Sequence, residues 1–478
     1  MTDALLFLPE TICLVMALLL FMAPVLQWSY RTAWGMALMG GVAAVAACLW
    51  TLHLEGEPFF PGIYRVDFFS QLIKTFLALG YLLVILVSRE PRTVRESARL
   101  ELPMFQLLAT VGMMMLVSAT EILTLYISME LSAYPIYVVV ALHRNRRLGS
   151  ESSTKYMVQG MVASAVSLYG MSFLFGVFGS TYFSAIGEQL DSVAANPLFW
   201  LGLVLMLSGF FFKLAIFPFH FWAPDIYQAG PHQVVTFIAT ASKVAAIAVL
   251  CRLVSLAMQF DADALGSFRT VLMWMSVAAM TLGNLAALRQ KDLKRLLGYS
   301  AVAHGGYVLI GLQSLSELGL TAALFYALGY FAISYVCFLV VCEVGRDEDL
   351  VTIKSVSGLY KRSPLLAATL LVGLLGLIGL PPTVGFIGKW FLFSAALEQG
   401  QFFLVLVAAV NAAVALYYYL LVIRQAYLVE PESPEPIQLS LPVATAAGAT
   451  AGLVLAMGVF PGVFWDRAAL AVEALLRW

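Results

Sequence analysis

The sequence predicts an all-helical protein that crosses a membrane many times. Of its 478 residues, 61% are hydrophobic and only 12% are charged, and the mean hydropathy is +0.89. Soluble domains carry about 45–50% apolar and about 25% charged residues, so this balance excludes a soluble fold. Apolar runs of about 20 residues, the length of a spanning helix, recur along the whole chain. The net charge of −1 leaves no basic excess for binding nucleic acid.

We expect about fourteen membrane-spanning helices. The run at 104–142 is too long for one span and is divided at 119–121, whereas the run at 364–396 has Pro381 and Pro382 at its middle. Because no basic stretch precedes the first run, we expect a retained helix rather than a cleaved signal peptide. The expected spans are 5–26, 33–52, 67–88, 104–118, 121–142, 156–180, 197–218, 232–257, 270–288, 296–314, 318–342, 364–396, 402–427 and 441–464.

Positive charges alternate between loops in a way that predicts orientation. Most of the 27 Lys and Arg residues gather near residues 31, 89–99, 144–155, 289–295, 346–362 and 424. The positive-inside rule places these loops on the inner side, and hence both termini on the outer side. Only Lys213, Lys243 and Lys389 are expected to be buried within spans. We expect Glu10 at the interface and Lys74 near the outer surface in a structural role.

A broken helix that carries a lysine occurs twice. The span 197–218 contains Lys213 and reaches Pro218, and the span 364–396 contains the Pro381-Pro382 pair and Lys389. They are the seventh and twelfth spans, and an odd offset inverts the second copy in the membrane. Inverted repeats with broken helices in matching positions indicate an ion path. We predict a three-helix segment (1–103), two inverted five-helix repeats (104–258 and 266–428) and a C-terminal span (429–478).

Ionisable side chains at membrane depth cost about 2.5–3.5 kcal/mol on insertion scales, so they indicate function. Glu130 shares a helical face with Tyr126, Tyr134 and Tyr137. Lys213 has no partner close in sequence, so it needs a carboxylate on another helix or must be neutral. The functional interpretation is proton exchange. The structural alternatives are a static ion pair, or a neutral Glu130 hydrogen-bonded to tyrosine.

Three further side chains extend this polar set. Lys243 lies on a face with Thr236 and Thr240, which could support a chain of waters. Lys389 follows the proline break, and its alternative role is snorkelling to the interface. His304 is suited to proton relay near neutral pH, although a hydrogen-bonded core histidine is the alternative.

The five cysteines form no Cys-x-x-Cys pair, so neither zinc nor an iron–sulfur cluster is predicted. The five histidines lack a His-x-x-x-His spacing, and haem would need paired axial ligands on facing helices. We therefore expect the chain to bind no metal or cofactor.

Three segments resemble the proton-translocating, antiporter-like membrane subunits of respiratory complex I. They are FKLAIFPFHFWAPDIYQ (212–228), QKDLKRLLGYSAVAHGGY (290–307) and GLPPTVGFIGK (379–389). The resemblance covers nearly the whole chain and is closest to the N-type subunit. The opening Leu8-Pro9-Glu10 and the segment 155–170 are N-like, and Lys389 stands where the M-type subunit usually has glutamate.

The resemblance implies a role for each of these residues. Glu130 would pair with Lys213, Lys243 would be the central proton carrier, and Lys389 the terminal carrier towards the outer side. His304 would lie on the hydrophilic axis between them. The partners would be neighbouring antiporter-like and small membrane subunits in the cell inner membrane. NADH, FMN, iron–sulfur clusters and quinone would be bound by other subunits.

Two alternatives use the same residues differently. One is a cation/proton antiporter subunit of the same fold without redox coupling. The other is a non-catalytic membrane scaffold whose buried charges are static, for which neutralising a lysine damages assembly but leaves pumping unchanged.

Overall fold

The computed structural model describes residues 5–56, 61–193, 196–259, 265–431 and 435–477. Within these ranges the regular elements are helices, and only isolated β-bridges join the loops. Ten of the described helices are long and apolar enough to cross a membrane, and shorter apolar helices accompany them. The prediction of an all-helical polytopic membrane protein is therefore confirmed.

The first half of the described chain alternates long helices with short turns. Its helices are α2 (Leu8–Phe21), α3 (Tyr30–Trp50), α4 (Phe68–Val87), α5 (Leu102–Ser118), α6 (Ile122–Ala141), α7 (Arg146–Phe178), α8 (Phe183–Gly187), α9 (Leu190–Val193), α10 (Pro197–Leu214), α11 (Trp222–Ala229), α12 (His232–Phe237) and α13 (Lys243–Ala257). A π-helical turn, η2 (Ile238–Ser242), joins α12 and α13 into one helix.

The second half is built in the same way. Its helices are α14 (Gly266–Ala287), α15 (Leu293–Gln313), α16 (Glu317–Val344), α17 (Leu359–Arg362), α18 (Pro364–Ile378), α19 (Val384–Glu398), α20 (Phe402–Leu428), α21 (Leu441–Val459) and α22 (Pro461–Leu476). Short 3₁₀ turns occur at Glu96–Ala98 and Ile353–Val356.

Acidic side chains mark several helix starts. The Asp67 carboxylate accepts a hydrogen bond from the Ser70 backbone N–H at 2.7 Å, and the Asp292 carboxylate accepts one from Arg295 at 2.8 Å. The Glu121 carboxylate accepts one from Thr124 at 2.7 Å, so the predicted division of 104–142 falls where α5 ends and α6 begins. Each cap satisfies an N–H group that has no partner within its helix.

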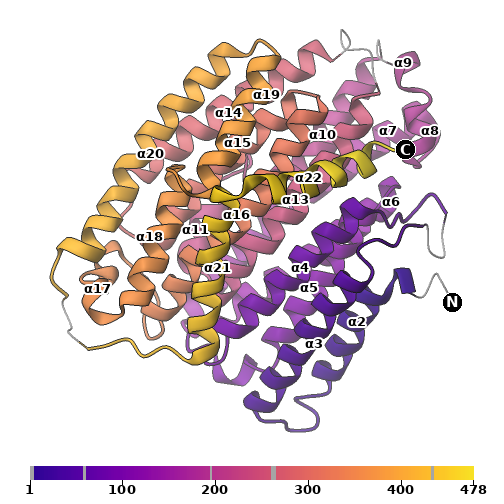
Figure 1. The fold of residues 1–478 in the computed structure, drawn as a ribbon. Coiled ribbons are helices and arrows are strands. Elements are labelled where there is room, and N and C mark those ends of the chain that lie inside the picture. Colours follow the sequence, from indigo (N-terminus) through magenta and orange to yellow (C-terminus); the bar gives the residue numbers. More distant parts are fainter. Residues whose placement is uncertain (1–4, 57–60, 194–195, 260–264, 432–434, 478) are drawn as a thin grey trace.

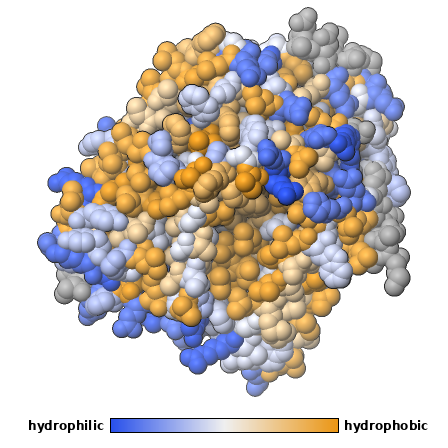
Figure 2. Space-filling model, viewed as in Figure 1, coloured by the Kyte–Doolittle hydropathy of each residue, from blue (hydrophilic) through white to orange (hydrophobic). Residues whose placement is uncertain are grey.

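Two helices form the centre of the bundle. The spans His232–Ala257 and Glu317–Val344 (α16) are buried over their whole apolar length. Helices α3, α7 and α20 lie further out and expose large apolar side chains such as Trp50, Val162 and Leu406. Apolar side chains accordingly cover much of the face in Figure 2, with hydrophilic residues towards its rim. Such a surface suits contact with lipid.

Both predicted breaks are present, and each begins at a left-handed residue. Helix α10 ends at Leu214, short of Pro218, because Ala215 has φ = 59° and closes the helix there. Helix α18 ends at Ile378, and Gly379 has φ = 85°. The chain resumes as α11 at Trp222 and as α19 at Val384. A left-handed residue is a common way to end a helix.

The C-terminal region differs from the prediction of one span at 441–464. Helix α21 ends at Val459, and Pro461 begins α22, which runs across the bundle instead of along it (Figure 1). Proline has no N–H to donate and suits the first turn of a helix, so it separates the two. Helix α22 packs against α4 and α16.

The close packing of α14 on α15 yields a prediction. A Cβ atom at Gly283 would lie 2.8 Å from the Ala303 nitrogen, whereas one at Gly452 of α21 would meet nothing within 4 Å. We expect Gly283→Ala to destabilise the folded chain by about 1–3 kcal/mol through overpacking. The control Gly452→Ala should be neutral or stabilising, because alanine favours helix by about 1 kcal/mol. Thermal denaturation of the purified protein measures both, and equal stability of the two variants would contradict the packing.

Candidate functional site

Glu130 and Lys213 face one small cavity. Glu130 lies on α6 and accepts a hydrogen bond from the Ser164 hydroxyl of α7, while the Lys213 ammonium donates to the Ser132 hydroxyl. Both side chains line a cavity of about 30 Å³ that also reaches Ser242. This volume can hold a water molecule. The structure records no ion pair between Glu130 and Lys213, and each group has a serine as its hydrogen-bond partner instead.

Lys243 lies at the centre of the bundle. It is the first residue after the π-helical turn η2, and its ammonium donates to the backbone carbonyl of Leu214, the last residue of α10. The same ammonium lies 5.6 Å from the centroid of the Trp222 ring. The Trp222 indole N–H in turn donates to the Phe212 carbonyl at 2.7 Å. Lys243 thus satisfies the carbonyl of the last residue of α10, and Trp222 adds a second donor to the Phe212 carbonyl, which also accepts from the Ala215 N–H at 2.9 Å.

Lys389 occupies a matching environment in the second half. Its ammonium donates to the carbonyls of Leu377 at 3.0 Å and Ile378 at 2.8 Å, the last two residues of α18. It also lies 4.7 Å from the centroid of the Tyr307 ring. Lys389 is 5% exposed, so it does not snorkel to an interface. The C-terminal end of a helix carries partial negative charge and stabilises a cation there.

The structure matches the lysines of the two halves differently from the sequence pattern. The sequence matched Lys213 with Lys389, because both lie in broken spans. By contact, Lys389 corresponds to Lys243, since each ammonium is bound by the final carbonyls of a broken helix. Lys213 precedes the break in its span, whereas Lys389 follows the break in its own. The Lys213 ammonium donates to the Ser132 hydroxyl of α6 and not to a carbonyl at a helix end.

His304 connects the two breaks. Its Nδ1 lies 2.5 Å from the Tyr326 hydroxyl of α16, and its Nε2 lies 3.4 Å from the Tyr419 hydroxyl of α20. Its ring centroid is 5.8 Å from that of Tyr307, which contacts Lys389. On the other side, a Cβ atom at the adjacent Gly305 would lie 3.5 Å from the Leu214 carbonyl that Lys243 binds. His304 and Tyr307 therefore lie on the side of α15 that meets the other polar groups.

The structure buries several charged side chains that were predicted to lie in loops, at the interface or near the outer surface. Lys294 was assigned to a loop, but it is buried, and its ammonium donates to the Gly230 carbonyl at 2.9 Å. Glu10 was expected at the interface and Lys74 near the outer surface, but both are buried, and the Lys74 ammonium lies 2.8 Å from the Glu10 carboxylate. Hydropathy places these residues near span ends, whereas their burial depends on neighbouring helices. The one sequence signal for this ion pair is that Glu10 and Lys74, residues of opposite charge, both lie within expected spans near the same side of the membrane.

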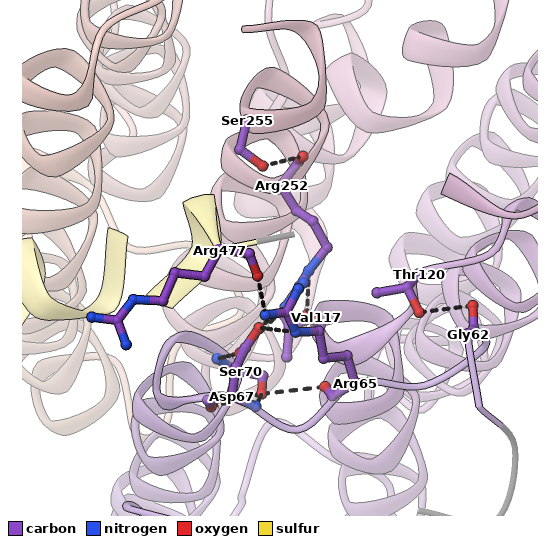
Figure 3. A network of polar contacts seen from close by, with 9 residues as sticks. All are labelled: Gly62, Arg65, Asp67, Ser70, Val117, Thr120, Arg252, Ser255 and Arg477. Carbon is purple, nitrogen blue, oxygen red and sulfur yellow. Dashed lines mark hydrogen bonds and ion pairs between the residues drawn. The ribbon is translucent and has the colours of Figure 1, made fainter. Parts of the chain in front are cut away.

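A second buried ion pair joins the N-terminal segment to the central helix. Arg252 of α13 donates to the Asp67 carboxylate at 3.2 Å and to the Val117 carbonyl at 3.1 Å. Figure 3 shows Asp67 between Arg252 and Arg65, with the Arg477 carbonyl beside them. Arg252 lies close to the end of the expected span 232–257, yet it is only 1% exposed.

In the described ranges, no group of three or more His, Cys, Asp and Glu side chains lies together as a metal site would require. The polar groups around Lys213, Lys243, His304 and Lys389 are instead lysines, a histidine, tyrosines and serines, which can donate and accept protons. The arrangement suits proton transfer in an apolar surrounding.

Comparisons with known proteins agree on the class. Residues 119–415 match the family model described as NADH:quinone oxidoreductase/Mrp antiporter, TM. The NADH-quinone oxidoreductase subunit N 2 of Syntrophobacter fumaroxidans is 44% identical, covering 98% of this chain and 99% of that protein. A chain of respiratory complex I from Thermus thermophilus superposes with a TM-score of 0.83 at 33% identity, covering 96% of this chain and 98% of that one.

A chain of the Mrp complex from Dietzia sp. DQ12-45-1b superposes with a TM-score of 0.88 at 21% identity, covering 100% of this chain and 98% of that one. At this identity the likeness shows the fold alone. Fold and buried lysines thus define an antiporter-like membrane subunit. Its similarity to the relatives above goes further: the chain belongs to the subunit N family of NADH-quinone oxidoreductase.

The contact between Gly379 and Lys389 gives the second prediction. Gly379 and Gly400 both have positive φ, 85° and 70°. A Cβ atom at Gly379 would lie 3.0 Å from the Lys389 Cδ, whereas one at Gly400 would meet nothing within 4 Å. Both alanine variants should lose about 1–2 kcal/mol of stability from the left-handed backbone. Gly379→Ala should lose roughly 1 kcal/mol more, because the hydrogen bonds of Lys389 are displaced. Thermal denaturation of the purified complex compares them, and equal losses would contradict this contact.

Proposed function

We propose that this chain moves protons along a buried path whose members are Glu130, Lys213, Lys243, His304 and Lys389. The chain is a proton-translocating membrane subunit of NADH-quinone oxidoreductase, as its family membership indicates. The observation that carries the path is the continuity of contacts between the two helix breaks. Lys243 binds the Leu214 carbonyl, Gly305 packs against that carbonyl, and the neighbouring His304 leads through Tyr307 to Lys389.

The path begins at the Glu130 cavity. Approach of the Glu130 carboxylate stabilises the charged form of Lys213, and its withdrawal leaves an ammonium in an apolar surrounding, which favours release of the proton. The serine partners of both groups support a state in which the pair is open. Lys213 then passes its proton towards Ser242, which lines the same cavity, and on to Lys243, the next residue in the chain. No bond other than those to the proton is made or broken.

The second part of the path runs from Lys243 to Lys389. His304 can accept a proton on one ring nitrogen and release one from the other, because both nitrogens face tyrosine hydroxyls. Lys389 receives the charge at the end of α18, where the carbonyls of Leu377 and Ile378 stabilise it. Protons would leave from there towards the outer side.

The architecture that we propose for this path has about fourteen spans. Two inverted five-helix repeats cover 104–258 and 266–428, preceded by the three-helix segment 1–103 and followed by 429–478. The matching ends of α10 and α18, each with a left-handed residue and a bound ammonium, support the repeat. Both termini would lie on the outer side of the plasma (inner) membrane of the cell, following the loop charges.

The chain works as part of a larger assembly. We propose that neighbouring antiporter-like and small membrane subunits contact its apolar outer helices. Other subunits would bind NADH, FMN, iron–sulfur clusters and quinone and supply the driving force. This chain itself would contribute proton transfer and no redox step.

Replacing the central lysine tests the path. Lys243→Ala removes the ammonium that bridges α13 and the end of α10. Proton pumping should therefore fall at least about tenfold, because alanine cannot carry a proton. Pumping is measured with a pH-sensitive dye in vesicles that contain the purified complex, while quinone reduction is followed in parallel.

The matched control is Lys354→Ala, which removes an exposed lysine of the loop before α17. It should pump as the wild type does. Wild-type pumping by an assembled complex that carries Lys243→Ala would contradict the proposal and favour the scaffold alternative.

A further inference from the structure

The buried ion pair of Glu10 and Lys74 takes no part in the proposed path. The Glu10 carboxylate of α2 and the Lys74 ammonium of α4 lie 2.8 Å apart, and both side chains are 0% exposed. The Tyr64 hydroxyl donates to the same carboxylate at 2.5 Å, and the Tyr64 ring lies 4.9 Å from the ammonium. A pair taken fully out of water is costly, and helices can be joined as well by apolar side chains. The pair therefore invites a functional explanation.

The pair is not fully satisfied, as a purely structural pair would be. The second carboxylate oxygen of Glu10 has no hydrogen-bond partner among the described residues, and the Lys74 ammonium has none beyond its contact with Glu10. Buried polar groups normally use all their hydrogen-bonding capacity. Free capacity on both partners allows the pair to exist in more than one protonation state.

One face of α4 leads from the pair to the outer end of the helix. Asp67, Gln71 and Lys74 are spaced by four and then three residues, so their side chains are neighbours on that face. Gln71 is buried, and neither atom of its amide has a partner among the described residues. It thus offers a donor and an acceptor between the ion pair and Asp67.

Asp67 opens onto a cavity at this end of the bundle. The cavity has a volume of about 420 Å³ and is lined by Glu55, Gly56, Arg65, Val66, Asp67, Ala474 and Arg477. Behind it, Arg252 holds the Asp67 carboxylate in place, as Figure 3 shows. Asp67 is therefore anchored on one side and reaches the cavity on the other.

We propose that Glu10 and Lys74 form an additional proton-binding site, which exchanges its proton with the outer cavity through Gln71 and Asp67. A proton from the cavity binds the Glu10 carboxylate and ends the ion pair, while Lys74 keeps its own proton. Release of that proton to the cavity restores the pair. One proton enters and the same number leaves, so charge and atoms balance without any redox step.

Among the described residues, the titratable groups that face this site from the packed elements are Cys13 of α2, Cys48 of α3 and Tyr64 of the loop before α4. At the cavity they are the charged residues named above, with Arg252 behind Asp67. The outer placement rests on the proposed function and its orientation, whereas the binding of a proton by Glu10 does not.

Infrared spectroscopy tests the proton directly. Difference spectra of the purified complex in nanodiscs, between the acid and alkaline ends of its working pH range, should contain a carboxyl C=O band of a buried acid. Glu10→Gln should abolish this band, and Gln71→Leu should slow its appearance after a pH jump. Glu55→Gln, the matched change of an acid at the cavity, should keep it. Identical spectra for the wild type and Glu10→Gln would overturn the site.

A second experiment separates proton binding from a structural role. The double variant Glu10→Leu with Lys74→Leu fills the same space without charge. A static pair predicts pumping that responds to outer pH as in the wild type, and that result would overturn the proposal. A proton-binding site predicts loss of this response, with quinone reduction unchanged. The control pair Arg144→Gln with Asp349→Asn removes a partly exposed ion pair elsewhere and should behave as the wild type.

The two proposals fail in distinguishable ways. If Lys243→Ala stops pumping while the double leucine variant keeps the wild-type response, only the additional site is wrong. If Lys243→Ala pumps normally, the main path is wrong whatever the Glu10 band does. Should the double variant not assemble, the band in Glu10→Gln still decides.

Discussion

Helices α10 and α18 end inside the helix bundle, and the binding of their last carbonyls by lysine ammonium groups determines much of the rest. A carbonyl without a partner in hydrocarbon costs several kcal/mol, and so does an isolated ammonium. At the ends of α10 and α18, the carbonyls accept hydrogen bonds from the lysine ammonium groups, so the cost of leaving either group without a partner is avoided. The left-handed residues Ala215 and Gly379 direct these carbonyls out of their helices. The breaks thus place buried lysines within the helix bundle.

The sequence predicts these breaks well but not the partners of the lysines. Prolines and lysines within apolar runs are visible in a single chain, and Lys213, Lys243 and Lys389 are all buried as expected. The acceptor of Lys243 is a backbone carbonyl, which any residue provides, so no side-chain pattern reveals it. For the same reason the correspondence of Lys389 with Lys243 emerges only from the contacts.

Burial near span ends is where sequence reasoning fails. Lys74, Arg252 and Lys294 lie close to predicted margins, and a hydropathy window cannot distinguish a margin that faces water from one covered by another helix. Here α4, α13 and α15 are covered by their neighbours. The helix α22 was missed for a related reason, since its apolar side chains continue the pattern of α21 and only Pro461 marks the turn.

The π-helical turn before Lys243 has a consequence for how charge and backbone influence each other. Lys243 joins α13 to the end of α10 only while its ammonium donates to the Leu214 carbonyl. Any displacement of α10 or of this turn therefore changes the affinity of Lys243 for a proton. By thermodynamic reciprocity, each change in its charge shifts the balance between backbone positions by an equal free energy. The proposed path can in this way receive work as a movement of helices and deliver it as a movement of charge.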